Sequence, residues 1–305
     1  MGFPVQLQDL GESRGLGWVP DYPDVRDYTP GHEEVSSLLA KTSVPESKQA
    51  ALPGRVDLRQ WCSPVEDQGH LNSCTAHAGV GMLEYFERKA CGKYVDASRL
   101  FLYKATRRLL GLYGDTGATL RSTAGAMTLF GVPPEQYWPY LEPDFENEPP
   151  AFCYAFAENY QAIKYYRLDP PGTKAEDVLG AIKSNLASNL PSMFGFTVYS
   201  SMASAGGTGG KVPFPAKGDK VRGGHAVMAV GYDDSMALPG GVLGKETRGA
   251  LLFRNSWGSA WGDQGYGWLS YDYVRYGIAQ DWWVLISQEW VDTEEFTKED
   301  EEEKG

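Results

Sequence analysis

The sequence predicts an α+β fold with two segregated halves, because helical patterns come early in the chain and strand patterns come late. Apolar residues recur at helical spacing in three segments between residues 74 and 131. After about residue 155 the chain changes to runs of β-branched and aromatic residues, each bounded by Gly or Asp. Because the two kinds of pattern do not alternate, an α+β arrangement is favoured over alternating βα units.

The first predicted helix begins at Cys74, contains no proline and ends just before Gly92. Two more helices are predicted over residues 98–111 and 120–131, the second of which ends at Gly131. The predicted strands cover residues 160–168, 192–200, 225–233, 250–257 and 265–271, and one further helix, 174–188, interrupts them.

These patterns divide the chain into four parts, namely 1–53, 54–155, 156–288 and 289–305. The first part is rich in proline, and its run GWVPDYPDVRDYTPG suits an extended arm on the surface. The second part is the helical half and the third is the strand half. The last part is acidic, and we expect it to be disordered.

Composition excludes some partners. The net charge of −12 argues against nucleic acid and against an anionic membrane surface, and no stretch has the apolar length of a membrane span. The start lacks the basic and apolar regions of a secretory signal, so an intracellular location is slightly favoured. We expect a monomer. Four cysteines are too few for a disulfide scaffold, and their pairing cannot be deduced.

Cys74 is the candidate nucleophile. It opens the first predicted helix, where unpaired N–H groups and aligned peptide dipoles favour a negatively charged sulfur. A buried structural cysteine is the alternative, although such a residue more often lies in the middle of a helix on its apolar face.

His225 is the candidate base among four histidines. It follows two glycines and starts an apolar strand, so its ring should face open space. His77 lies three residues after Cys74 on the same helix and is better explained by packing. His70 lies in the loop before Cys74, and His32 lies in the arm.

Two amides and a tryptophan complete the candidate site. Asn255 could accept a hydrogen bond from one ring nitrogen of His225 and leave the other nitrogen facing sulfur. Trp257 could shield that bond from water. Gln68 could donate to an oxyanion together with the N–H of Cys74. Taken singly, Asn255 and Gln68 are also ordinary turn residues.

This set resembles the papain-like cysteine peptidases. The matching segments are PVEDQG with SCTAHA, GGHAVMAVGYD, and NSWGSAWGDQGYGW, and they occur in the family's order of Cys, His and Asn. The resemblance covers about residues 54 to 287 and is most like a bacterial branch. It implies a papain-like two-lobed fold with the active-site cleft between a helical lobe and an antiparallel, barrel-like β lobe.

The resemblance also implies function. It assigns Cys74, His225, Asn255 and Gln68 as catalytic, and it suggests Gly117, Gly224 and Trp257 as substrate-binding residues, with no metal and no cofactor. The expected reaction is endopeptidase cleavage of peptides or proteins through an acyl-enzyme. The expected N-terminal arm is too short for the long helical propeptide of lysosomal members. We expect residues 1 to about 50 to lie near the cleft and inhibit the enzyme as in a zymogen, although simple packing on the body is an alternative.

Two other functions remain open from the sequence. The same fold could act as an amidase, an acyl transferase or an exopeptidase, and the loop 200–223 or the arm could block one end of the cleft. A binding protein on a peptidase scaffold is the second alternative. Loss of Cys74 or His225 would indicate it, and both residues are present.

Overall fold

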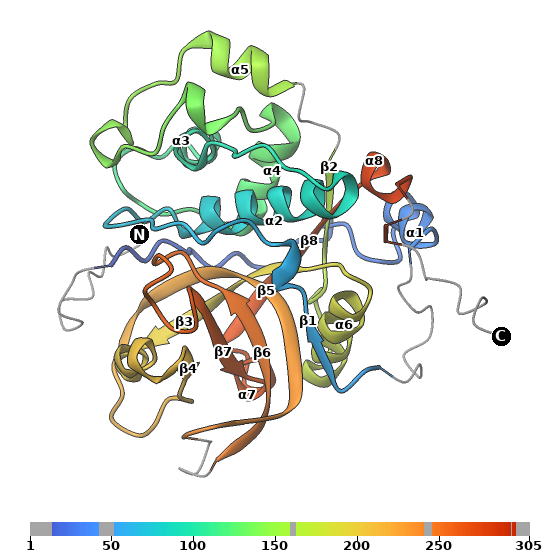
Figure 1. The fold of residues 1–305 in the computed structure, drawn as a ribbon, viewed down its shortest axis with the longest axis vertical. Helices are drawn as coiled ribbons and strands as arrows, with labels where there is room; N and C mark the ends of the chain where they lie inside the picture. The colour runs from blue at the N-terminus through green and yellow to red at the C-terminus, as the bar shows by residue number, and fades with distance from the viewer. Residues whose placement is uncertain (1–13, 43–51, 159–162, 241–245, 294, 297–305) are drawn as a thin grey trace.

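The computed structural model describes residues 14–42, 52–158, 163–240, 246–293 and 295–296. Figure 1 shows a group of helices on one side of the molecule and a curved sheet on the other, with helix α2 at the boundary between them. The predicted α+β class and its two-lobed arrangement are confirmed.

The helices of the described residues fall into three groups. One side of the molecule carries α2, α3, α4 and α5, the sheet side carries α6 and α7, and two short helices, α1 and α8, lie together (Figure 1). Their bounds are α1 Glu33–Leu39, α2 Cys74–Cys91, α3 Arg99–Leu109, α4 Leu120–Phe130, α5 Ala151–Ala157, α6 Ala175–Ala187, α7 Asp272–Arg275 and α8 Gln288–Val291.

The strands form one sheet in the order β2-β8-β3-β5-β6-β7-β4, and β1 pairs with β5 off this path. All pairs are antiparallel except β4 with β7. The strands are β1 Arg55–Asp57, β2 Ile163–Arg167, β3 Ser192–Tyr199, β4 Lys211–Val212, β5 Val221–Leu238, β6 Thr247–Arg254, β7 Tyr266–Ser270 and β8 Ala279–Ser287.

Helix α2 is the longest helix described and ends as its sequence requires. Gly92 takes the left-handed conformation, with φ of 70°, and its N–H donates to the carbonyl of Arg88. Only glycine adopts this C-terminal conformation without steric cost, so the helix stops there. The neighbouring helices begin at side-chain caps, because Ser98 accepts from the N–H of Phe101 and Thr119 accepts from that of Ser122.

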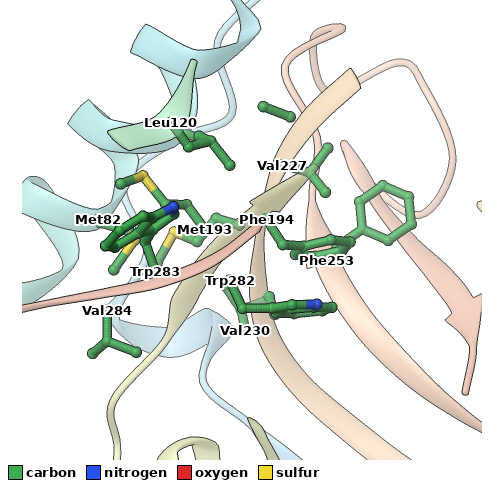
Figure 2. Close-up of a cluster of buried hydrophobic side chains, with 14 of the residues drawn as sticks. Met82, Leu120, Met193, Phe194, Val227, Val230, Phe253, Trp282, Trp283 and Val284 are labelled. Atoms are coloured by element: carbon green, nitrogen blue, oxygen red, sulfur yellow. The ribbon is translucent and has the colours of Figure 1, made fainter. Parts of the chain in front are cut away.

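Two apolar clusters lie on opposite faces of the sheet (Figure 2). Strand β8 divides them, because successive side chains of a strand point to opposite faces. Trp282 stacks on Phe194 with ring centroids 4.0 Å apart, whereas Trp283 lies with Met82 and Met193 on the side of α2. Both indoles are fully buried. The sheet therefore packs on the helical side with one face, and its other face buries a second apolar cluster.

The predicted helices and strands are present, and several elements were not predicted. These are α1, α5, α7, α8, β4 and β8. Strand β5 starts at Val221, so His225 lies inside the strand and not at its start. The segment 54–155 contributes β1 to the sheet, through pairing with β5. The four-part division of the chain stays a prediction.

Both ends of the chain pack against the rest of the protein. In the arm, Leu16 and Trp18 are buried. The tail is not disordered at its start, because α8 forms and Trp290 stacks on Phe86 with ring centroids 4.5 Å apart. Phe296 is buried as well. Residues 297–305 lie outside the described residues.

We expect Trp290→Ala to lower the free energy of unfolding by about 3 kcal/mol, because it removes a buried aromatic ring that covers Phe86. Urea denaturation of the full chain would measure it. Glu289→Ala, at an exposed neighbouring position, should change stability by less than about 0.5 kcal/mol. Equal stability of the two variants would contradict the packing of α8.

Candidate active site

Cys74 lies at the first position of α2 and is fully buried. Its Sγ atom accepts two backbone hydrogen bonds, from the N–H of Ala226 on β5 and from the N–H of Gly17 in the arm, each at 3.3 Å. The sulfur therefore lies where the helical side, the sheet and the arm meet.

The imidazole of His225 is held by Asn255. The His225 Nε2 and Asn255 Oδ1 atoms are 2.7 Å apart, and Oδ1 also accepts the N–H of Ser256. Because an amide oxygen only accepts, Nε2 carries the proton in the neutral ring. The other ring nitrogen, Nδ1, is buried and has no hydrogen-bond partner among the described residues. It is therefore free to take a proton.

Aromatic rings enclose the histidine. The indole of Trp257 stacks on the imidazole with centroids 4.7 Å apart, and Phe196 meets it edge-on at 5.9 Å. Trp257 is buried, and it also contacts Trp261. These rings exclude water from the bond between His225 and Asn255, which strengthens it.

Gln68 is fixed at both ends of its side-chain amide. Its Oε1 accepts from the hydroxyl of Ser256 at 2.6 Å, so Nε2 is the end that donates. Nε2 donates to the carbonyl of Leu71 at 2.7 Å and to that of Gly15 in the arm at 3.1 Å. The Gln68 amide therefore already donates a hydrogen bond to a backbone carbonyl of the N-terminal arm.

Burial keeps sulfur and imidazole neutral in this arrangement. It raises the pKa of the Cys74 thiol to about 11, although the N–H groups of Ala226 and Gly17 oppose the shift. It lowers the pKa of His225 to about 4, against the opposing hydrogen bond to Asn255. Between these values the resting pair is thiol and imidazole, without the charge separation that nucleophilic attack needs.

The arm crosses the sulfur as an extended backbone with glycine at its closest approaches. A Cβ atom on Gly15 would lie 2.0 Å from the carbonyl oxygen of Leu71, and one on Gly17 would lie 1.7 Å from that of Asn72. Any side chain at these two positions would collide with backbone, which cannot move aside cheaply. The N–H of Leu16 donates to the Asn72 side chain at 2.8 Å.

Beyond the sulfur the arm pairs with both sides of the molecule. The N–H of Ala118 donates to the carbonyl of Gly17 at 2.8 Å, and the N–H of Val19 donates to the carbonyl of Ala118 at 3.0 Å. The N–H of Trp18 donates to the carbonyl of Gly224 at 3.1 Å. The arm therefore binds to the body as one more extended segment.

The sequence pointed to Gly117, but its neighbour Ala118 makes the backbone bonds to the arm. Gly117 has φ of 72°, and a Cβ atom there would lie 2.2 Å from the carbonyl oxygen of Gly17. Glycine at position 117 therefore lets the backbone of the arm lie close to this loop. Gly224 accepts the N–H of Trp18, and a Cβ atom there would lie 2.4 Å from the Trp18 carbonyl oxygen.

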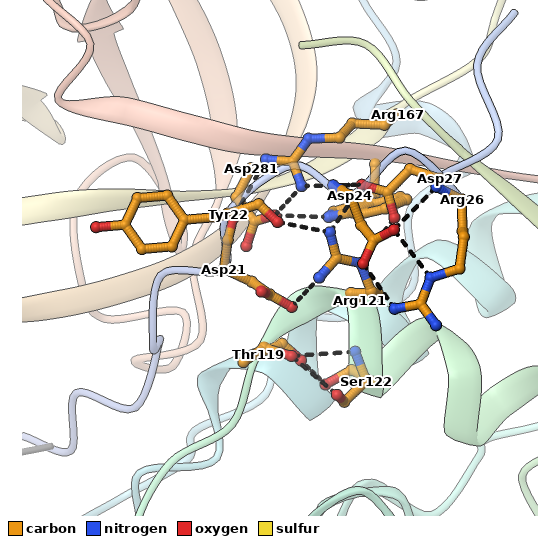
Figure 3. Close-up of polar contacts among 12 residues, drawn as sticks. Asp21, Tyr22, Asp24, Arg26, Asp27, Thr119, Arg121, Ser122, Arg167 and Asp281 are labelled. Atoms are coloured by element: carbon orange, nitrogen blue, oxygen red, sulfur yellow. Dashed lines mark hydrogen bonds and ion pairs between the residues drawn. The ribbon is translucent and has the colours of Figure 1, made fainter. Parts of the chain in front are cut away.

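Ion pairs fasten the arm further along (Figure 3). Arg121 of α4 pairs with Asp21 and Asp27 of the arm, and it binds Asp27 through two hydrogen bonds of 2.7 and 2.8 Å. On β2, the Nη1 atom of Arg167 lies 3.6 Å from Oδ2 of Asp27 and 3.2 Å from Oδ1 of Asp281, which is on β8. No sequence signal identified Arg121, Arg167 or Asp281, because their meeting depends on the fold.

The other histidines lie away from this arrangement. His77 packs edge-on against Tyr140 and lies 3.1 Å from the Ser73 carbonyl, which agrees with the packing role expected for it. His70 is exposed beside Glu142, and His32 caps α1. The four cysteines all lie in the described residues and form no disulfide.

The described residues contain no group of three or more His, Cys, Asp or Glu side chains placed to hold a metal ion. None of the helices within those ranges combines the length and apolar character needed to cross a bilayer. A pocket of about 250 Å³ lies beside the site and is lined by Arg14, Trp257 and Trp261 among others. A larger one of about 840 Å³, between α1 and β2, contains none of the predicted site residues.

Comparison with known proteins gives one consistent family. Residues 52–286 match the family model described as papain family cysteine protease. An uncharacterized peptidase C1-like protein of Acanthamoeba polyphaga mimivirus is 32% identical, over 90% of this chain and 87% of its own length. A cathepsin L-like peptidase of Aedes aegypti is 28% identical, over 72% of this chain and 60% of its own length.

A solved structure agrees. The crystal structure of xylellain, a cysteine protease from Xylella fastidiosa, is similar with a TM-score of 0.70 and 32% identity. The match covers 90% of this chain and 97% of the xylellain chain. The likeness extends over nearly the whole of both chains.

We expect Cys74 to react slowly with iodoacetamide in the full chain at pH 7.5, and much more slowly than the exposed Cys91. The reactive species is the thiolate, so the Cys74 rate should rise about tenfold per pH unit toward its pKa of about 11. Peptide mass spectrometry separates the two sites. Cys74 reacting as fast as Cys91 at pH 7.5 would show that the arm does not cover the sulfur.

Proposed function

The chain belongs to the papain family of cysteine proteases, and we propose that it is an endopeptidase in which Cys74, His225 and Asn255 form the catalytic triad. It is a hydrolase that acts on peptide or protein substrates. We further propose that residues 14 to 27 of the arm restrain it by occupying the substrate position. The observation that carries both proposals is the arm backbone bonded to the Cys74 sulfur and to the Gln68 amide.

The proposed reaction is acyl transfer through the sulfur. The Cys74 thiolate attacks the carbonyl carbon of the scissile peptide, a carbon–sulfur bond forms, and the oxygen takes the negative charge. Imidazolium Nδ1–H of His225 gives its proton to the leaving amine as the carbon–nitrogen bond breaks. The same nitrogen then takes a proton from water, whose oxygen displaces the thiolate and releases the carboxylic acid product.

Asn255 supports this assignment of the two ring nitrogens. Its carbonyl oxygen receives Nε2–H at 2.7 Å, so Nδ1 is the nitrogen left for the sulfur side. The alternative tautomer would place two acceptors against each other. Trp257 covers the bond and keeps the ring in one orientation, which supports the proposal that Nδ1 serves the reacting atoms.

Gln68 and the N–H of Cys74 are the proposed oxyanion donors. The Gln68 Nε2 already donates to a peptide carbonyl, that of Gly15, at 3.1 Å. Ser256 fixes the amide by donating to its Oε1 atom, so no reorientation is needed when charge develops. Donors held in advance stabilise the transition state without a reorganisation cost.

The path of the arm favours endopeptidase over exopeptidase activity. The described arm continues on both sides of the sulfur, with Gly15 bonded to Gly69 on one side and Val19 bonded to Ala118 on the other. An exopeptidase needs a group that closes one end of the site. A site that holds continuous chain in both directions can cut within a long peptide.

The arm restrains the enzyme in this proposal by three effects. It takes the hydrogen bonds that a substrate backbone would use, on Gly224 and Ala118. It covers the Cys74 sulfur, and burial removes the charges of Cys74 and His225 at neutral pH. It occupies the donor of Gln68. Displacement of the arm would free the backbone bonding groups, the sulfur and the Gln68 donor at the same time.

The direct test is mass spectrometry of a diverse peptide mixture after incubation with full-length Gly17→Val, in which the new side chain displaces the arm, in reducing buffer at mildly acidic pH. Internal cuts that Cys74→Ala abolishes are expected. Trimming from one end only would point to the exopeptidase alternative. Cuts that persist in Cys74→Ala would exclude Cys74 as the nucleophile.

We expect Gln68→Ala to lower kcat by about 10²-fold, because one oxyanion donor is lost. Because Gln68 also bonds to the arm, steady-state kinetics on a single peptide substrate would compare the enzymes in the Gly17→Val background, with KM changing much less. Gln60→Ala, at an exposed glutamine, is the matched control and should leave kcat unchanged. A Gln68→Ala enzyme with full kcat would remove Gln68 from the mechanism.

We expect Gly17→Val to raise the peptidase rate of the full chain about tenfold or more, because a side chain there collides with the Asn72 carbonyl and displaces the arm. Gly31→Val is the matched control, since a Cβ atom at Gly31 meets nothing within 4 Å. Initial rates without preincubation are the readout. Equal rates for the two variants would refute restraint by the arm.

A further inference from the structure

The hydroxyl of Tyr140 joins the two chain segments that supply the proposed oxyanion donors. It donates to the main-chain carbonyl of Gln68 at 2.9 Å, and its oxygen lies 2.6 Å from the Oγ atom of Ser73. Gln68 supplies the side-chain donor, and Ser73 directly precedes Cys74, whose N–H is the second proposed donor. One hydroxyl, from a residue 72 positions after Gln68, therefore contacts both donor segments.

The direction of each hydrogen bond in this network follows from the groups involved. A carbonyl oxygen only accepts, so the Tyr140 O–H donates to Gln68, and the Tyr140 oxygen accepts the O–H of Ser73. The Ser73 carbonyl likewise accepts Nδ1–H of His77 at 3.1 Å. Burial lowers the pKa of His77 to about 3, so this ring is neutral. Burial raises the pKa of Tyr140, so its hydroxyl keeps its proton.

Ser73 is used differently from a serine at most helix starts. It is the N-cap of α2, where a serine side chain ordinarily accepts a backbone N–H of the first turn. No such bond forms here, and the Ser73 hydroxyl is bonded to Tyr140 instead. Ser73 is fully buried, so this bond is not a surface contact. The start of α2 is thereby held by a residue of another segment.

The backbone of Gln68 is held from both sides. Its N–H donates to the carbonyl of Ser256 at 2.9 Å, and its carbonyl accepts from Tyr140. The first bond fixes Gln68 to the segment that carries Asn255, whereas the second fixes it to the start of α2 through Ser73. Loss of the Tyr140 hydroxyl would let Gln68 shift relative to the sulfur. A misplacement of about 1 Å can lower a rate by up to about 10²-fold.

Resting on the proposed function, we propose that Tyr140 is a positioning residue for the oxyanion donors. Its hydroxyl acts through Gln68 and Ser73, and it holds the Gln68 amide and the Cys74 N–H at a fixed separation. Because these donors bind charge that develops only in the transition state, Tyr140 contributes to kcat and not to KM. The Tyr140 ring packs against His77, so removal of the hydroxyl alone separates positioning from packing.

The first test is a double-mutant cycle in the Gly17→Val background, in which the arm is displaced. We expect Tyr140→Phe to lower kcat about tenfold, with KM changed less than about twofold. In a chain that also carries Gln68→Ala, the same substitution should lower kcat less than about threefold, because it acts through Gln68. A tenfold loss in both backgrounds, or no loss in the first, would overturn the proposal.

Tyr85→Phe is the matched control for this cycle. The Tyr85 side chain is buried, and its hydroxyl also donates to a main-chain carbonyl, that of Asn189, at 3.1 Å. Tyr85→Phe should leave kcat unchanged. Ser73→Ala removes the other hydroxyl of the network and should lower kcat about threefold. If Tyr140→Phe does not fold, Ser73→Ala supplies the cycle with Gln68→Ala, and full additivity of those two substitutions would equally overturn the proposal.

The second test does not depend on catalysis. In the full chain the Gln68 side-chain amide donates to the arm, and hydrogen exchange of its protons, followed by NMR after isotope labelling of glutamine, reports how firmly it is held. We expect Tyr140→Phe to speed this exchange about tenfold and Tyr85→Phe to leave it unchanged. Equal exchange in Tyr140→Phe and the wild type would overturn the proposal. If the Gly17→Val parent cuts no peptide, the proposed function fails, and the exchange rates still decide whether Tyr140 holds Gln68.

Discussion

The contact between the N-terminus of α2 and strand β5 determines the geometry of the whole site. The helix brings Cys74, the strand brings His225, and the N–H of Ala226 bonds the sulfur directly. Because Ala226 follows His225 in the chain, this one bond fixes sulfur and imidazole relative to each other. The packing of Met82 and Met193 behind it, between α2 and β3, makes the contact rigid. Reactive groups from two distant segments are therefore positioned by a buried surface, and loops have little part in it.

The arm binds this site by two different principles. At the sulfur it bonds through its backbone, and Gly15 and Gly17 are needed because a side chain at either position would collide with the backbone of residues 71 and 72. Further along it depends on particular side chains, with Trp18 on Asp281 and acidic residues on Arg121. The first part imitates any peptide, whereas the second part is specific to this chain. This combination explains how a short segment can occupy a site that is built to accept many sequences.

The local parts of the fold and the site could be predicted from sequence, and the non-local parts could not. Cys74, His225, Asn255 and Gln68 stand in motifs with characteristic neighbours, and helix α2 carries its own stop signal at Gly92. Strand β8 was missed because its apolar run is buried on both faces and lacks the alternation that identifies a strand. Asp281 was missed for a different reason, because its contact with Trp18 joins residues 263 positions apart in the sequence.

The arm and the site belong to one polypeptide, and this connection has a kinetic consequence. An inhibitor that is covalently tethered acts at a fixed effective concentration, commonly in the millimolar range for a short flexible connection, however dilute the protein is. Dilution therefore cannot dissociate the arm bonded to Cys74, and a free peptide must compete against that local concentration. Release of the arm from the site is therefore a first-order process, and its rate depends on the stability of the contacts that the arm makes. The substrate concentration needed to compete with the arm is therefore the same at every concentration of the protein.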